Sequence, residues 1–221
     1  MISDEDKIAK PIIIRKQMTQ KRLQIFSKAP VQGQVKTRLI PDLGEQGACD
    51  VYLDLLERSV SLAVQSGYKT QLWCAPDQRH AYFQTQAENN AVELHEQYGS
   101  NFGERMYHAL YEGLESAEKV VLIGADCPVF TVAYWAKAFD ALSRSDVVLG
   151  PAEDGGFVLV ACRKTHRAMF NGVNWGHSTV LEQTLAALES AKLTHHLLPM
   201  LWDVDTFDDL KRWRAIKGDC A

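Results

Sequence analysis

The sequence predicts an α/β protein with a mainly parallel sheet, and three observations support this prediction. Short apolar segments typical of strands alternate with longer segments of helical periodicity from residue 23 onward. Residues 120–123, Val-Val-Leu-Ile, form a continuous apolar run, which is typical of a strand buried on both faces in a parallel sheet. No internal repeat and no Pro/Gly linker divides the chain, so we expect residues 21–221 to form a single domain after an N-terminal extension of residues 1–20.

In the first half of the chain, two helices are expected among three strands. Residues 45–66 place Val51, Tyr52 and Leu55 on one face at helical spacing, and Gly67 follows as a typical C-terminal stop. Residues 103–117 repeat the same periodicity, with Met106, Ala109, Leu110, Gly113, Leu114 and Ala117 on the apolar face. The strands expected around these helices are residues 23–26, 69–74 and 91–95.

The second half of the chain continues the alternation. Residues 131–142 and 179–191 have helical periodicity, and a last helix is expected to start near Thr206, where Asp209 completes a capping box. The expected strands are residues 120–123, 146–149, 157–161 and 193–198. Asp154-Gly155 between two of these strands is a strong hairpin signal.

Composition excludes several classes of protein. The chain has 221 residues, of which 46% are hydrophobic and 24% charged, as in an average soluble domain and unlike a fibre, a disordered chain or a membrane protein. Lys+Arg 24 against Asp+Glu 28 gives a net charge of −4, which argues against nucleic acid as a partner of the whole surface. No apolar run approaches the ~20 residues of a membrane span.

Cysteine usage and the N-terminus both favour a cytoplasmic location. The 5 cysteines include no CxxC pair, so they form neither a disulfide framework nor a zinc ribbon. The chain begins with an acidic segment where a signal peptide would be basic.

The loop after the first expected strand, residues 27–38, concentrates positive charge. It contains Lys28, Lys36 and Arg38, with Pro30 and Gly33 to shape the backbone. Fixed cations and backbone N–H groups together suit an anion that carries several phosphates. Neither the P-loop pattern nor GxGxxG is present. A solvated basic loop explains the composition equally well, so both interpretations stay open.

Acidic residues follow three of the later strands. Asp126, after residues 120–123, could hold a divalent ion that bridges phosphates, or it could only cap a turn. Glu153 and Asp154 lie in the expected hairpin, where a purely structural turn is the favoured interpretation and a substrate-facing role the alternative. Asp203 and Asp205 share one face of an extended segment, so either could join Asp126 on a metal.

Four motifs in this order resemble those of a known family. They are Ser-Lys-Ala-Pro…Gly-x-Val-Lys-Thr-Arg-Leu at 27–39, Gly-Ala-Asp-Cys-Pro at 124–128, Gly-Pro-Ala-Glu-Asp-Gly-Gly-Phe at 150–157 and Asp-Val-Asp-Thr at 203–206. The chain resembles, over residues 22–215, the bacterial DUF2064 family of GT-A-fold, glycosyltransferase-like proteins, which is related to the molybdenum-cofactor and F420-pathway nucleotidyltransferases. Residues 98–106 also resemble the family's Leu-Gly-x-Arg-Met segment, with Phe102 in place of the leucine. Without the resemblance, residues 101–104 read only as a helix cap.

The resemblance implies a fold, a cofactor and roles for particular residues. The fold would be a three-layer α/β/α sandwich of the nucleotide-diphospho-sugar transferase type, and the cofactor Mg²⁺ or Mn²⁺. Carried over by position, Lys28, Lys36 and Arg38 would bind the phosphates, and Asp126 and Asp205 the metal. Glu153 and Asp154 would face the acceptor or the sugar as candidate catalytic residues. The DxD motif of such folds is missing, because Cys127 and Pro128 follow Asp126.

The expected function is therefore that of a metal-dependent transferase with a nucleotide-sugar donor and a small-molecule acceptor. One alternative is a nucleotidyltransferase that releases pyrophosphate from a nucleoside triphosphate. The other, from a different class, is a nucleotide-binding module that has lost its chemistry. Neither nucleic acid nor a membrane span is expected, and the oligomeric state stays open between a monomer and a homodimer.

Overall fold

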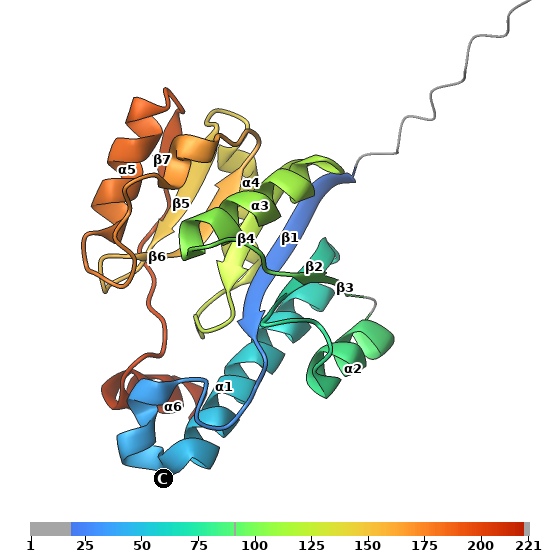
Figure 1. Cartoon of the computed structure of the whole chain (residues 1–221), viewed down its shortest axis with the longest axis vertical. Helices are drawn as coiled ribbons and strands as arrows, with labels where there is room; N and C mark the ends of the chain where they lie inside the picture. Colours follow the sequence, from blue (N-terminus) through green and yellow to red (C-terminus); the bar gives the residue numbers. More distant parts are fainter. Residues whose placement is uncertain (1–18, 91, 219–221) are drawn as a thin grey trace, which may run out of the picture.

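A single mixed sheet organises the described part of the chain (Figure 1). The computed structural model describes residues 19–90 and 92–218. Within them the sheet has 7 strands in the order β3-β2-β1-β4-β6-β5-β7. The strands are β1 (Thr19–Lys28), β2 (Lys69–Ala75), β3 (Glu93–Glu96), β4 (Ala117–Gly124), β5 (Val147–Pro151), β6 (Phe157–Cys162) and β7 (His195–Leu197). The helices are α1 (Ile40–Gln65), α2 (Ala81–Asn90), α3 (Phe102–Leu114), α4 (Val132–Ala141), α5 (Val180–Ser190) and α6 (Phe207–Lys217), with 3₁₀ turns η1 (Thr37–Leu39) and η2 (Arg167–Phe170).

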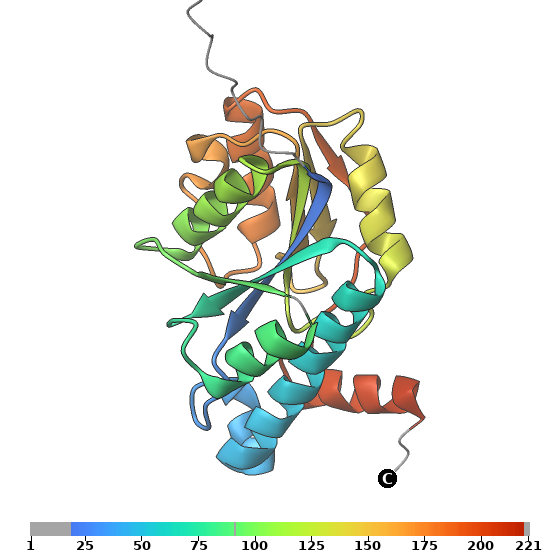
Figure 2. The ribbon, with the colours of Figure 1, turned by 90° about the vertical axis from the view of Figure 1, so that its right-hand side faces the viewer.

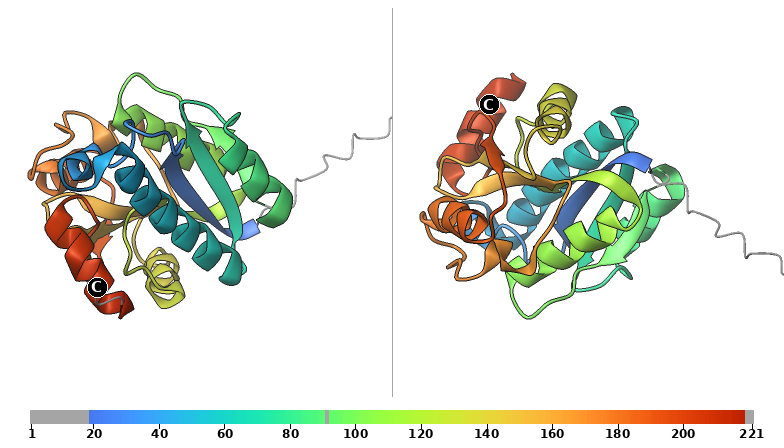
Figure 3. Two further views of the ribbon diagram at one scale, coloured as in Figure 1. Left: turned by 90° about the horizontal axis from the view of Figure 1, so that it is seen from below. Right: turned by 90° about the horizontal axis from the view of Figure 1, so that it is seen from above.

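Helices cover both faces of this sheet, which confirms the predicted three-layer α/β/α architecture (Figures 2 and 3). On one face, Leu23 and Ile25 of β1 pack in a core with residues of α1, α2 and α4. On the other face, Phe26 packs with residues of α3, η2 and α5. Alternate residues of a strand point to opposite faces, so β1 contributes to both cores.

The sheet is mainly parallel, as predicted, but one strand runs against its neighbours. β1 pairs in parallel with β2 and β4, β2 with β3, and β5 with β7, whereas β6 is antiparallel to both β4 and β5. The apolar run in β4 therefore predicts its burial correctly, and β4 pairs in parallel with β1 on one side but antiparallel with β6 on the other. Burial on both faces comes from the covering helices and is independent of strand direction.

Local signals predict most element boundaries to within a few residues. The capping box forms at Thr206 and Asp209, and Gly67 has a positive φ of 73° after α1. The hairpin expected at Asp154-Gly155 joins β5 to β6. Helix α3 ends at Leu114, three residues early, because Ala117 already pairs with β1 as the first residue of β4.

The structure differs from the sequence-based predictions at the start of one helix and in one helix that was not predicted. Helix α1 begins at Ile40, with a kink at Gly44. Helix α2 was not predicted, because Phe83 is its single buried residue and polar side chains make up most of the rest, which leaves no apolar stripe.

Several predictions lie wholly or partly outside the described residues. Of the expected extension, residues 1–20, only the last two are described, and they begin β1. The domain boundaries stay a prediction. Cys49, Cys74, Cys127 and Cys162 are buried and unpaired, and Cys220 lies outside the described residues. Among the described helices, none is both long and apolar enough to cross a bilayer.

Candidate functional site

A cleft of about 440 Å³ opens at the carboxyl ends of β1 and β4. Its walls come from the loop after β1, the end of β4, the start of β6, the first turns of α3 and the segment before α6. All five residues predicted for phosphate and metal binding line it: Lys28, Lys36, Arg38, Asp126 and Asp205. This is the edge at which open α/β sheets bind ligands.

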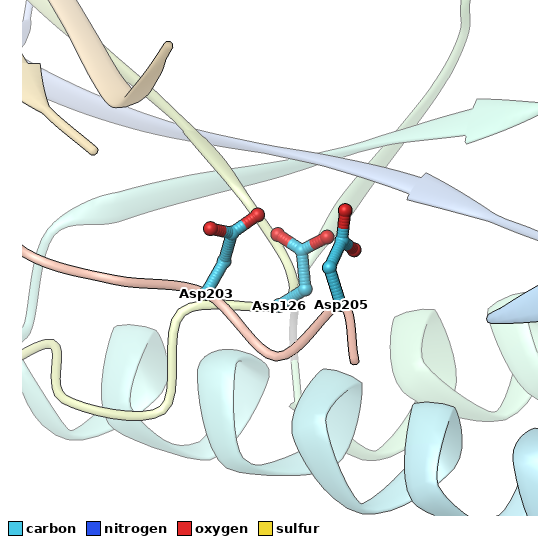
Figure 4. Close-up of side chains that lie close together, drawn as sticks. All are labelled: Asp126, Asp203 and Asp205. Atoms are coloured by element: carbon cyan, nitrogen blue, oxygen red, sulfur yellow. The ribbon is translucent and has the colours of Figure 1, made fainter. Parts of the chain in front are cut away.

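Three aspartates converge in the cleft (Figure 4). Asp126, Asp203 and Asp205 each offer one carboxylate oxygen, and these oxygens lie within 4.8 Å of one another. The segment before α6 is held there because the Val204 N–H donates to the Asp126 carbonyl oxygen at 3.1 Å. Val204 itself is fully buried, so its two neighbours both face the cleft. The sequence left open which of the two would join Asp126, and the structure brings both.

Lys36 lies between two of these carboxylates. Its Nζ is 3.0 Å from Asp126 Oδ2 and 2.9 Å from Asp205 Oδ1, and its side chain is only 6% exposed. The residue adopts a left-handed backbone, with φ 44° and ψ 44°, which is uncommon without glycine. Burial works to lower the pKa of Lys36, but the two carboxylates outweigh it and raise the pKa above its ordinary value. The ammonium therefore stays charged.

Arg38 and Lys28 occupy more open positions. The Arg38 guanidinium donates from Nη1 to Asp205 Oδ2 at 2.7 Å, and its side chain is 68% exposed. Lys28 is exposed, and its ammonium has no ion-pair partner among the described residues. Its backbone N–H donates to the Tyr52 hydroxyl at 2.7 Å, which fixes the end of β1. Lys28 is thus available to an anion, whereas Arg38 already shares Asp205 with Lys36.

The third carboxyl of the group, that of Asp203, behaves differently. It makes no hydrogen bond to another described residue, and burial raises its pKa to about 7, with further contributions from Asp126 and Asp205. Three carboxylates at this spacing repel one another, and among residues 19–90 and 92–218 only Lys36 and Arg38 form ion pairs with them. A further cation would therefore be attracted to the Asp203 side of the group.

The donor set fits a divalent cation of the hard type. It consists of carboxylate oxygens alone, without the thiolate or imidazole ligands that favour zinc or copper. Such an ion would compete with the Lys36 ammonium, because both would bind the carboxylate oxygens of Asp126 and Asp205.

Part of the cleft wall is aromatic, and the sequence did not identify this wall as a functional feature. The predicted cap forms, with Asn101 Oδ1 accepting from the Glu104 N–H at 2.9 Å. The same turn also places Phe102 and Arg105 in the cleft, and Phe102 is 44% exposed. Arg105 has no ion-pair partner within the described residues. The family-like segment at residues 98–106 was the signal that could have identified this wall.

Glu153 and Asp154 are not among the cleft's lining residues. Both Glu153 carboxylate oxygens accept from Arg212 of α6, at 2.7 and 3.1 Å. Asp154 Oδ1 accepts from the Gly156 N–H at 2.8 Å within the hairpin. Gly155 is required there, since its φ is +88° and an added Cβ would lie 2.0 Å from a backbone oxygen. The structural interpretation of this turn is confirmed, while the catalytic role of the two acids stays a prediction.

Solved structures define the class to which the fold belongs. The chain is similar to a "putative nucleotide-diphospho-sugar transferase" from Desulfovibrio desulfuricans G20, with a TM-score of 0.79 and 29% identity over 86% of this chain and 84% of that one. It is also similar to a nucleotidyl transferase from Methanothermobacter (TM-score 0.64, 13% identity, 89% and 97% covered) and to the inositol-1-phosphate CTP transferase from T. maritima (TM-score 0.60, 12% identity, 91% and 96% covered). The latter two likenesses concern the fold alone. The fold is that of nucleotidyl and nucleotide-sugar transferases.

Within that class the family can be stated. The model of the family described as "Uncharacterized protein conserved in bacteria (DUF2064)" matches residues 59–177, which is more than half of the chain. The chain belongs to this family. No curated protein matches its sequence.

Proposed function

We propose that this protein is a metal-dependent transferase that uses a nucleotide-activated donor, specifically a nucleotide-diphospho-sugar. The observation that carries the proposal is the convergence of three aspartates, Lys36 and Arg38 in one cleft at the carboxyl edge of the sheet. The likeness to the Desulfovibrio protein supports a nucleotide-using transferase.

Two sets of side chains in the cleft would bind such a donor, one cationic and one carboxylate. Lys28, Lys36 and Arg38 would bind the phosphates, since fixed cations stabilise the negative charge that develops on a leaving diphosphate. Asp126, Asp205 and Asp203 would hold Mg²⁺ or Mn²⁺. When bound, the ion would neutralise phosphate charge and favour departure of the nucleotide.

Of the two hairpin acids, Asp154 is the better candidate to face the acceptor. Its Oδ1 accepts from the Gly156 N–H, and its other carboxylate oxygen has no hydrogen-bond partner among the described residues. Glu153 has both oxygens engaged by Arg212. We expect Asp154→Asn to lower turnover at least tenfold, and Glu153→Gln to lower it less than threefold, in steady-state assays. The reverse order would remove Asp154 from the catalytic role.

A second candidate is a nucleotidyltransferase that releases pyrophosphate, and the fold of the Methanothermobacter and T. maritima proteins favours keeping it. The released product separates the two reactions in a ³¹P NMR assay. A nucleoside diphosphate indicates sugar transfer, and pyrophosphate indicates nucleotidyl transfer. Nucleotide binding without turnover over a broad acceptor panel would instead indicate a binding module.

The metal assignment is tested by binding measurements on the full chain. Nucleoside diphosphates, triphosphates and nucleotide-sugars are titrated with and without Mn²⁺, using the wild type and Asp126→Asn. We expect the variant to lose at least tenfold of its Mn²⁺-dependent affinity. Asp140→Asn is a matched control, because Asp140 is an exposed aspartate on α4. Unchanged Mn²⁺ dependence in Asp126→Asn would refute the metal assignment.

A further inference from the structure

A second hollow, of about 480 Å³, lies beside α3 and is not used by the proposed function. It is bounded by α3, by η2 and by the segment that follows η2. The lining residues that matter here are Glu104, Tyr107, His108, Arg167, Asn171 and Trp175. Its volume is in the range of small-molecule sites.

The hollow adjoins the cleft through Trp175. The Trp175 ring packs edge-on against Phe102 and Phe157, with ring centroids 5.3 and 6.2 Å away. Both phenylalanines line the cleft. Gly103 allows this packing, because an added Cβ would lie 3.0 Å from the Trp175 ring. A ligand in the hollow would thus be separated from the cleft by a single layer of aromatic rings.

The hollow combines flat apolar surfaces with polar groups that have no partner in the described part of the chain. Trp175 and Tyr107 provide rings, and the half-buried Trp175 side chain makes no hydrogen bond to another described residue. The Asn171 side chain is equally unpaired, and Arg167 has no carboxylate partner, its guanidinium lying 5.7 Å from the centroid of the Tyr107 ring. His108 Nδ1 is buried without a hydrogen-bond partner.

The charges in this hollow are balanced, unlike those of a polyphosphate site. Glu104, Arg167 and His108 all line the hollow. The backbone N–H and the hydroxyl of Ser100 both donate to Glu104 Oε2, so Glu104 Oε1 has no partner among the described residues. The group therefore offers an amide, a carboxylate oxygen, a guanidinium and an indole N–H, so donors and acceptors are both present. A ligand with a net negative charge would be repelled by the Glu104 carboxylate. A wholly apolar ligand would bury these polar groups without hydrogen-bond partners, which costs binding free energy.

We propose that this hollow binds a saccharide, a ring with apolar C–H faces and a rim of vicinal hydroxyl groups. The aromatic rings would contact the faces, and Asn171, Arg167 and Glu104 would pair with the hydroxyls, each of which both donates and accepts. Because the ring layer separates the hollow from the cleft, the bound saccharide would not be the acceptor, and this inference stands apart from the proposed function.

The test uses the full chain and saturation-transfer NMR with D-glucose, D-mannose and N-acetyl-D-glucosamine, without nucleotide. Cyclohexanol serves as a ring that lacks the hydroxyl rim. We expect at least one pyranose to bind and cyclohexanol not to bind. Arg167→Ala and Asn171→Ala should each weaken that pyranose at least fivefold. Arg144→Ala is the matched control, since Arg144 is an exposed arginine after α4.

Failure of this inference differs from failure of the proposed function. Absence of binding by all three pyranoses, or binding that neither variant weakens, would overturn the saccharide site. Nucleotide affinity is measured on the same samples, and neither variant should change it by more than twofold. Nucleotide binding without saccharide binding would reject the hollow alone. Saccharide binding without nucleotide binding would reject the transferase and leave the hollow as a saccharide site.

Discussion

Replacement of Lys36 by methionine tests how the aspartate group is held together. The ammonium is buried and bridges Asp126 and Asp205, so the variant leaves two carboxylates facing each other with less positive charge. Removal of one partner from a fully buried ion pair costs about 3–5 kcal/mol. The two carboxylates are 34% and 36% exposed, so solvent screening reduces the expected loss to about 2 kcal/mol. For a domain of this size, that loss lowers the Tm by about 4–8 °C.

A divalent cation should restore what the substitution removes. In Lys36→Met the ion no longer competes with the ammonium, so Mg²⁺ or Mn²⁺ should raise the Tm of the variant more than that of the wild type. Saturation at 100 times the Kd adds about 2.7 kcal/mol, which would recover the loss.

Thermal unfolding of both proteins, with EDTA and over a metal titration, measures this difference. Lys119→Met is the matched control, because Lys119 Nζ donates to the Phe139 carbonyl and the Ser143 hydroxyl and has no carboxylate partner in the part of the chain that the structure describes. A variant as stable as the wild type in EDTA would refute the electrostatic role of Lys36. A loss that metal does not reverse would refute cation binding by the aspartates.

Two further predictions concern stability. Gly155→Ala should cost about 3 kcal/mol in urea unfolding, because its φ is +88° and the new Cβ would lie 2.0 Å from the Ser178 oxygen. Gly67→Ala, at φ +73° with nothing within 4 Å, should cost only about 1 kcal/mol, and equal losses would contradict the steric argument. Asp146→Asn should cost about 1 kcal/mol at pH 7, since Asp146 accepts from the N–H and hydroxyl of Thr194. Although burial opposes it, this bonding lowers the pKa of Asp146, so its stabilisation is complete above pH ~4 and is lost as the pH falls further. A difference between variant and wild type that does not shrink on acidification would contradict the assignment.

The fold could be predicted largely from short-range signals. Helical spacing located α1, α3, α4 and α5, and turn chemistry located the cap at Thr206 and the hairpin at Gly155. These signals can be recognised in the sequence because they depend only on residues within a few positions of one another. Helix α2 gave no such signal, since its single buried residue, Phe83, leaves no apolar stripe to detect.

The candidate site was predictable as a set of residues but not as a set of contacts. Residue type and position after a strand indicated Lys36, Asp126 and one of the pair Asp203 and Asp205, and all four line the cleft. That both aspartates of this pair lie beside Asp126 depends on the backbone hydrogen bond from the Val204 N–H to the Asp126 carbonyl oxygen. The cleft-facing role of Phe102 was hidden, because a helix cap already explained its neighbours.

By itself, the amino-acid sequence determined the three-layer class, the order of its elements and the pool of charged residues near one sheet edge. Tertiary structure decided which of those charges meet. Lys36 contacts carboxylates 90 and 169 residues away, across a strand order that places β4 beside β1 and brings the chain back before α6. Periodicity and turn chemistry act over a few residues, whereas such contacts arise from packing of the whole sheet. The net charge of −4 therefore conceals a local balance of cations and carboxylates that appears only on folding.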